Sequence, residues 1–347
     1  MRRNMPIYRA LLLLLACVGA CRPDPNNRRV PSTWRDPSPH ASRMVTIAPG
    51  VAVEVLDWGG RGRPLVFLAG LGDTPHVYDD FAPAFTDSLH VYGITRRGFG
   101  HSTGLPDSDA VTLVSDLRAV LDSLRLSRVI LIGHSIAGEE LTGFCATYRD
   151  RCDALVYLDA ASDRSDSDTK RGRELERLWR PAVRRPPMTS ADSASLAAVE
   201  AYYARNAVRG LPEAEVRALT RFDSAGRYAG RIGYDSLGAQ HIGRLLSHLP
   251  PPAYHRLKCP SLAIYAVPDS AGAYFPWYGA LDSAGKRDAL RYFRALLPGI
   301  RADIDQYRRE APSLHVVEIH NASHWVFISH RDETLNAIRP FLATARW

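Results

Sequence analysis

The chain has 347 residues, of which 46% are hydrophobic and 23% are charged. This balance is typical of a soluble globular protein, and it argues against wholesale disorder and against a polytopic membrane protein. The formal net charge is +7, and only three of the 44 basic residues are Lys. The Arg residues are scattered along the chain. The charge therefore does not predict binding to a nucleic acid, because such binding requires basic residues gathered on one face of the protein.

Residues 1–21 have the pattern of an export signal. Basic residues precede an apolar run from Ala10 to Ala20 that is too short to cross a bilayer. The run ends Val18-Gly19-Ala20-Cys21, which resembles a bacterial lipoprotein signal, where a Cys after small residues is lipidated. Cys21 fits better than Cys17, and the anchor would hold the protein at a membrane, in the periplasm or at the cell surface. An ordinary cleaved secretory signal is the alternative.

Residues 22–43 hold five prolines among polar residues, a composition that predicts a semi-extended tether. The folded part is therefore expected to begin near Met44. Three further cysteines follow, and in an oxidising compartment they allow at most one disulfide. Cys152 could pair with Cys145 or with Cys259, and three buried thiols are an equal alternative.

From Met44 onward, short apolar and β-branched runs alternate with helical patterns, which predicts an α/β fold with a mostly parallel sheet covered by helices. The expected strands are 51–56, 64–68, 90–94, 128–132, 154–158, 261–267 and 314–319. Residues 162–257 show helical patterns without a clear strand and predict an inserted helical cap. The core would then comprise residues 44–161 and 258–347, the latter with a second insertion from 270 to 313.

The sharpest motif joins a buried apolar run to a helix through Gly133-His134-Ser135-Ile136-Ala137. It resembles the nucleophile elbow of the α/β-hydrolase superfamily, whose pattern is G-x-S-x-G. In that turn the Ser adopts a strained conformation, so the residues two before and two after it must be small. Gly133 meets the requirement, and Ala137 stands where Gly is usual. The resemblance implies that Ser135 is the nucleophile.

The resemblance extends along almost the whole mature chain and implies further site residues. Leu68-Ala69-Gly70-Leu71-Gly72 ends an earlier strand, where the family places its oxyanion loop. By this match the oxyanion donors are the backbone N–H groups of Leu71 and Ile136, the second of which follows the nucleophile.

A Ser hydroxyl needs a base, and the base needs an acid to orient it; the superfamily's chain order is Ser, acid, His. His324 is the expected base, because it follows small residues in the loop after the last strand, whereas His320 falls at the strand end. Asp269, at the end of the penultimate strand, is the expected acid. Asp159 ends the strand 154–158 and is the rival, since some members carry the acid one strand earlier.

No cofactor or metal is expected from the sequence. His241, His248 and His255 repeat every seven residues, but no carboxylate or Cys completes a metal set with them. The phosphate-loop pattern G-x-x-x-x-G-K is absent from the sequence, and the glycines around Phe99 lack the dinucleotide spacing.

Together these features predict a serine hydrolase that cleaves a small-molecule ester through a Ser135-Asp269-His324 triad and an acyl-enzyme. The choice of an ester follows from analogy with the fold. Amide, lactone or thioester hydrolysis and perhydrolysis on the same triad are alternatives. So is a ligand-binding or sensing protein of the same fold that performs no turnover.

Overall fold

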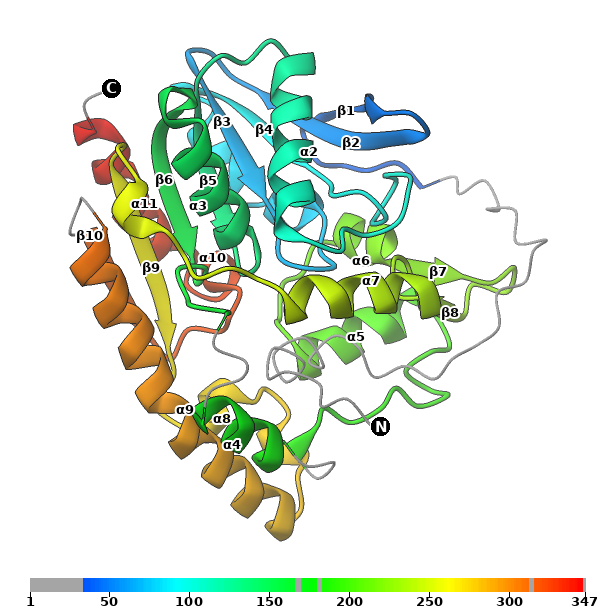
Figure 1. Cartoon of the computed structure of the whole chain (residues 1–347). Helices are drawn as coiled ribbons and strands as arrows, with labels where there is room; N and C mark the ends of the chain where they lie inside the picture. The colour runs from blue at the N-terminus through cyan, green and yellow to red at the C-terminus, as the bar shows by residue number, and fades with distance from the viewer. Residues whose placement is uncertain (1–33, 166–169, 180–182, 312–314, 346–347) are drawn as a thin grey trace.

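The computed structural model describes residues 34–165, 170–179, 183–311 and 315–345 (Figure 1). The expected export signal, with Cys17 and Cys21, lies outside these residues. Within them, the first strand begins earlier than expected, because Ala41 already pairs with Asp57. The expected tether boundary at residue 43 is therefore wrong at its carboxyl end.

The core of the fold is an eight-stranded sheet in the order β1-β2-β4-β3-β5-β6-β9-β10. The pairs β1–β2 and β2–β4 are antiparallel, and the other pairs of this sheet are parallel. Every residue of β5, β6 and β9 is buried, as continuous apolar runs covered on both faces must be. The strands are β1 (Ala41–Ala48), β2 (Val51–Gly59), β3 (Arg63–Leu68), β4 (Leu89–Ile94), β5 (Val129–His134), β6 (Cys152–Leu158), β9 (Ser261–Val267) and β10 (His315–His320).

Helices cover both faces of the sheet (Figure 1). One hydrophobic cluster packs α2, α3 and the carboxyl-terminal part of α9 against the sheet, and another packs α10 and α11 against its opposite face. The helices are α2 (Ala110–Ser123), α3 (Ala137–Thr147), α4 (Lys170–Leu178), α5 (Leu196–Asn206), α6 (Glu213–Leu219), α7 (Ser236–Ser247), α8 (Ala271–Tyr274), α9 (Ser283–Glu310), α10 (Val326–Ser329) and α11 (Arg331–Thr344).

Between β6 and β9 the chain forms α4 to α7 and a small hairpin, in the segment where the sequence predicts a helical cap (Figure 1). The hairpin pairs β7 (Thr220–Phe222) with β8 (Tyr228–Arg231) and was not expected, because strands this short leave no clear alternation. Helix α4 packs against α9 of the second insertion through a separate aromatic core.

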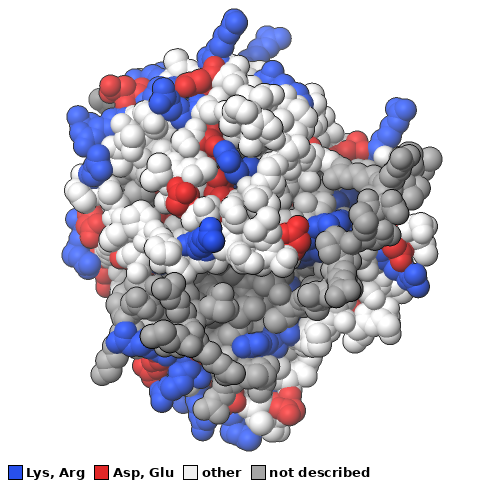
Figure 2. All heavy atoms as spheres, turned by 45° about the vertical axis from the view of Figure 1, so that its right-hand side comes forward, with Lys and Arg blue, Asp and Glu red and all other residues white. Residues whose placement is uncertain are grey.

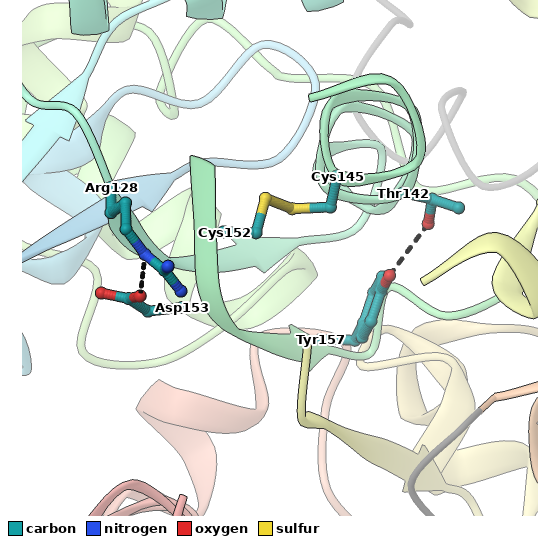
Figure 3. Close-up of a disulfide and its surroundings, with 6 residues drawn as sticks. All are labelled: Arg128, Thr142, Cys145, Cys152, Asp153 and Tyr157. Atoms are coloured by element: carbon teal, nitrogen blue, oxygen red, sulfur yellow. Dashed lines mark hydrogen bonds and ion pairs between the residues drawn. A yellow bond between two sulfur atoms is a disulfide. The ribbon is translucent and has the colours of Figure 1, made fainter. Parts of the chain in front are cut away.

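A disulfide joins α3 to the start of β6 (Figure 3). It links Cys145 to Cys152, whose Cα atoms are 5.8 Å apart, and so selects one of the two pairings left open by the sequence. Cys259 remains a buried free thiol. Burial raises the pKa of this thiol to about 11, so it is protonated and unreactive at neutral pH.

Two surface properties complete the description. On the face shown in Figure 2, basic side chains are separated by acidic and uncharged ones and form no continuous stripe. Among the described residues, no helix combines the length and the apolar character needed to cross a bilayer.

Candidate active site

Ser135 occupies a tight turn between the end of β5 and the start of α3. Its φ angle is +56°, in the left-handed region that non-glycine residues rarely adopt. A Cβ atom added at Gly133 would lie 2.8 Å from the Cβ of Ala137, so a side chain at either end of the turn leaves no room for one at the other. Because position 133 is a Gly, the methyl group of Ala137 fits in the turn without a clash at that position.

His324 lies in the loop between β10 and α10, and its partner is Asp159. The Nδ1 atom of His324 is 2.6 Å from Oδ2 of Asp159. The other carboxylate oxygen of Asp159 accepts a hydrogen bond from the backbone N–H of Ala266 at 3.1 Å. Asp159 follows β6 directly and has a φ of +47°. This strained position fixes the carboxylate between β6 and β9.

The expectation that Asp269 orients His324 is therefore corrected. Asp269 lies two residues beyond the end of β9, and its carboxylate contacts Nδ1 of His320 at 2.7 Å and accepts from the side-chain amide of Asn321 at 2.8 Å. Its side chain is 48% exposed, against 22% for Asp159. Both acids follow parallel strands at one edge of the sheet, but only Asp159 reaches the imidazole of His324.

His134, the residue before Ser135, contacts the loop that bears His324. Its Nε2 atom is 2.9 Å from the backbone carbonyl oxygen of His324, and the two rings lie 4.4 Å apart. Burial and the neighbouring His324 hold the pKa of His134 well below its usual value, so the ring is neutral and Nε2 is the donor. Sequence reasoning missed this contact, because the second position of the motif accepts any residue.

The Ser135 hydroxyl has no hydrogen bond to any residue that the structure describes. The hydrogen bond between a nucleophile and its base is often long before substrate binds. The contact between His134 and the His324 carbonyl nevertheless ties the turn that bears Ser135 to the loop that bears His324.

The two expected oxyanion donors lie on either side of this turn. Leu71 is in the loop after β3, and Ile136 immediately precedes α3. Among the described residues, neither backbone N–H has a protein acceptor. Helix α3 places its positive amino-terminal end at Ile136, which favours negative charge there.

The loop that bears Leu71 is fixed by buried polar contacts. Asp73 accepts from the indole N–H of Trp325 at 3.0 Å, and the carboxylate of Glu215 accepts from the backbone N–H of Thr74 at 2.9 Å. Burial raises the pKa values of both carboxyl groups. Arg231 donates to the Gly72 carbonyl at 3.0 Å. Glu215 and Arg231 come from α6 and β8, so the inserted segment holds the loop in place.

Helix α7 covers the apolar side of the two donors. Leu71 and Ile136 belong to one buried cluster with Ile242 and Leu245 of α7. The hydroxyl of Tyr234, just before α7, is 3.4 Å from the Leu71 carbonyl oxygen. Helix α7 therefore packs directly against the two residues whose N–H groups are the expected donors.

Comparison with known protein families identifies the family to which this chain belongs. The alpha/beta hydrolase family profile matches residues 65–337. The chain belongs to the α/β hydrolase family. The family's pattern includes a Ser in a tight turn between a strand and a helix, as at Ser135, and a His that follows the Ser and the acid in the chain, as at His324.

Two curated relatives match shorter segments. The non-heme chloroperoxidase CPO-A1 of Kitasatospora aureofaciens is 38% identical over 121 residues, which cover 34% of this chain and 43% of that protein. The sn-1-specific diacylglycerol lipase ABHD11 of Danio rerio is 28% identical over 129 residues, or 36% of this chain and 41% of that protein. The chain thus spans less than half the length of each.

Two solved structures share the fold over most of their length. E-2-(acetamidomethylene)succinate hydrolase aligns with a TM-score of 0.64 and 20% identity, covering 88% of this chain and 100% of that one. A marine microorganism esterase aligns with a TM-score of 0.57 and 18% identity, covering 84% of this chain and 99% of that one. At this identity the likeness concerns the fold alone.

Proposed function

We propose that this protein is a serine hydrolase that cleaves small-molecule carboxylic esters through an acyl-enzyme, with Ser135 as nucleophile, His324 as base and Asp159 as the orienting acid. The observation that carries the proposal is the hydrogen bond between His324 Nδ1 and Asp159 Oδ2, 2.6 Å long, together with the His134 contact that ties the loop of His324 to the strained turn of Ser135. Asp159 takes the role that the sequence assigned to Asp269.

In the first half-reaction, His324 acts as the base. Because its Nδ1–H donates to Asp159, the lone pair of its neutral ring is on Nε2 and can accept the Ser135 proton. The Ser135 oxygen attacks the ester carbonyl, and the N–H groups of Leu71 and Ile136 stabilise the resulting oxyanion. The protonated His324 then gives its proton to the departing alcohol.

In the second half-reaction, a water molecule replaces the alcohol. His324 takes a proton from the water, which attacks the acyl carbonyl, and the same two N–H groups hold the oxyanion again. Collapse of this intermediate releases the carboxylic acid and returns the proton to Ser135. The Asp159 carboxylate stabilises the imidazolium in both halves.

The proposed substrate class rests on the names of the similar proteins. A diacylglycerol lipase and an esterase stand among the similar proteins, and both names denote ester cleavage. Haloperoxidases also stand among them, so peroxide as the second acceptor of the acyl group is the rival activity.

A fluorophosphonate probe tests the nucleophile directly. The wild-type protein should be labelled at Ser135, and Ser135→Ala should lose the label together with on the order of 10⁴- to 10⁶-fold in turnover. Ser115→Ala, at an exposed position on α2, is the control that should retain both. Turnover of p-nitrophenyl esters of graded chain length then gives the acyl preference. The proposal would be wrong if the folded wild-type protein were neither labelled by the probe nor active on esters.

We further propose that the protein is exported and lipid-anchored at Cys21. The Cys145–Cys152 disulfide supports export, because disulfides persist in oxidising compartments. Metabolic labelling with a fatty acid should mark the wild type and Cys17→Ala but not Cys21→Ala. If Cys21→Ala were labelled and Cys17→Ala were not, the lipidated residue would be Cys17.

A further inference from the structure

Far from Ser135 in the sequence, four side chains converge next to the amino-terminal end of the described chain. Asp36 and His40 precede β1, whereas His76 lies in the short helix η1 (Pro75–Tyr78) and Asp79 follows it. One ligand atom from each of the four residues lies within 4.8 Å of the other three. The sequence analysis did not find this set, because it assigned residues 22–43 to a tether.

The distances between these atoms fit a tetrahedral metal site. His40 Nε2 is 3.3 Å from Asp36 Oδ2 and 3.3 Å from Asp79 Oδ1. His76 Nδ1 is 3.2 Å from Asp36 Oδ2 and 3.1 Å from Asp79 Oδ2. A tetrahedral ion with bonds of about 2.0 Å separates its ligand atoms by roughly 3.3 Å. The four distances are close to this value, with Asp36 Oδ2 facing both imidazoles and Asp79 facing His40 with Oδ1 and His76 with Oδ2.

Hydrogen bonding accounts for only part of the cluster, through the contact between His76 Nδ1 and Asp79 Oδ2 at 3.1 Å. The side chains of His40 and Asp79 are only 4% and 3% exposed. Both ring nitrogens of His40 and the Oδ1 atom of Asp79 are buried without a hydrogen bond of good geometry, although His40 Nε2 and Asp79 Oδ1 lie 3.3 Å apart. Such atoms are costly unless something else satisfies them. A cation among the four residues would satisfy His40 Nε2 and Asp79 Oδ1 together and would balance the charges of both carboxylates.

We propose that Asp36, His40, His76 and Asp79 bind a zinc ion. Two imidazoles and two carboxylates suit Zn²⁺, whereas Mg²⁺ and Ca²⁺ prefer oxygen ligands alone. Four protein ligands close the coordination sphere, so the ion has a structural role and no open position for catalysis. It ties the segment before β1 to η1, which follows the loop that bears Leu71.

The neighbourhood of His76 fits this assignment. A carboxylate oxygen of Glu54 and a ring nitrogen of His101 both lie within 4.8 Å of a His76 ring nitrogen. Glu54 is itself held by Thr95, whose hydroxyl donates at 3.0 Å, and by His101 at 2.7 Å. Metal-bound histidines commonly have a carboxylate beside the ring, and Glu54 is in position to serve as one.

The test measures zinc and thermal stability on the purified full chain, independently of any ester turnover. After exposure to zinc and desalting, elemental analysis should find about one zinc per chain, and chelation should lower the melting temperature. Asp36→Asn, on the partly exposed side of the site, should lose at least tenfold in zinc affinity while remaining folded. His90→Gln, which removes another His–Asp contact of 2.9 Å outside the cluster, should keep its zinc.

Cobalt provides a second readout that does not depend on any variant. Co²⁺ bound to the wild type should give the intense visible absorption of a tetrahedral complex, and Zn²⁺ should displace it. A folded wild type without stoichiometric zinc, whose melting temperature responds to neither zinc nor chelator, would overturn the proposal. Equal loss of zinc from His90→Gln would overturn it as well, because the metal would then not belong to these four ligands.

Discussion

His324 and Asp159 are joined by a hydrogen bond of 2.6 Å between Nδ1 and Oδ2, although 165 residues separate them in the sequence. The same carboxylate is held by the backbone of β9 through Ala266. The carboxylate is therefore held in a fixed position, because Oδ1 accepts from the backbone of β9 while Oδ2 contacts the imidazole of His324. Asp269 has no such role, because its oxygens are taken by His320 and Asn321.

The first prediction separates the two acids. Asp159→Asn should lower kcat for a p-nitrophenyl ester by about 10⁴-fold, because the amide leaves His324 in the wrong tautomer. Asp269→Asn is the matched control and should stay within about threefold of the wild type, since it removes only an exposed contact. Steady-state kinetics of both variants decide the matter, and the reverse ranking would restore Asp269 as the acid.

The second prediction concerns His134, a positioning residue for the base. Replacing it by Phe leaves the His324 carbonyl without its donor, a loss of about 1–3 kcal/mol that should appear as a ten- to hundredfold fall in kcat. KM should hardly change, because His134 has no proposed contact with substrate. His134→Gln can donate from a similar position and should recover most of kcat. Equal losses in the two variants would mean that the hydrogen bond is not what matters.

The pH profile gives His134 a further readout. Burial and His324 lower its pKa, so His134 stays neutral over the range in which a catalytic His titrates. The acidic limb of kcat/KM should therefore be unchanged in His134→Gln.

The third prediction tests the disulfide. The bond closes a loop of residues seven apart, and loop-closure entropy gives it about 2 kcal/mol of stability. Replacing both Cys145 and Cys152 by Ala should lower the free energy of unfolding by about this amount in urea. Dithiothreitol should lower the midpoint of the wild type and of Cys259→Ala but leave the double variant unaffected. A reductant effect that disappears in Cys259→Ala would point to a different pairing.

The sequence was sufficient for the elements that carry strong local patterns. Strands β5, β6 and β9 are continuous apolar runs, and the small residues around Ser135 leave few conformations open. Strand β1 was missed because five of its eight residues are exposed and its polar residues do not alternate regularly with apolar ones. The sequence favoured Asp269 over Asp159 as the partner of His324 on family analogy alone, because both follow strands that end at one edge of the sheet. Only side-chain contacts between distant segments distinguish them.

The last prediction uses Asp107, a buried carboxyl group near Arg97. Burial, and then the negative charge of Asp116, raise the pKa of Asp107 to about 8, while Arg97 at 3.3 Å opposes the shift. In the unfolded chain the pKa is near 4. Between these values the folded protein holds a proton that the unfolded chain releases, so stability falls as the pH rises and stops falling above pH 8.

Asp107→Asn removes this dependence, because the amide mimics the protonated acid and never ionises. At pH 4 or below, where Asp107 is largely protonated in the folded and the unfolded chain, the variant should unfold at nearly the same urea concentration as the wild type. At pH 9 it should be more stable, with about 1.4 kcal/mol for each pH unit between the two pKa values as the upper limit. Asp150→Asn, at an exposed position, should show no such difference. If Asp107→Asn shifted the midpoint equally at both pH values, its effect would come from packing, and Asp107 would not titrate as inferred.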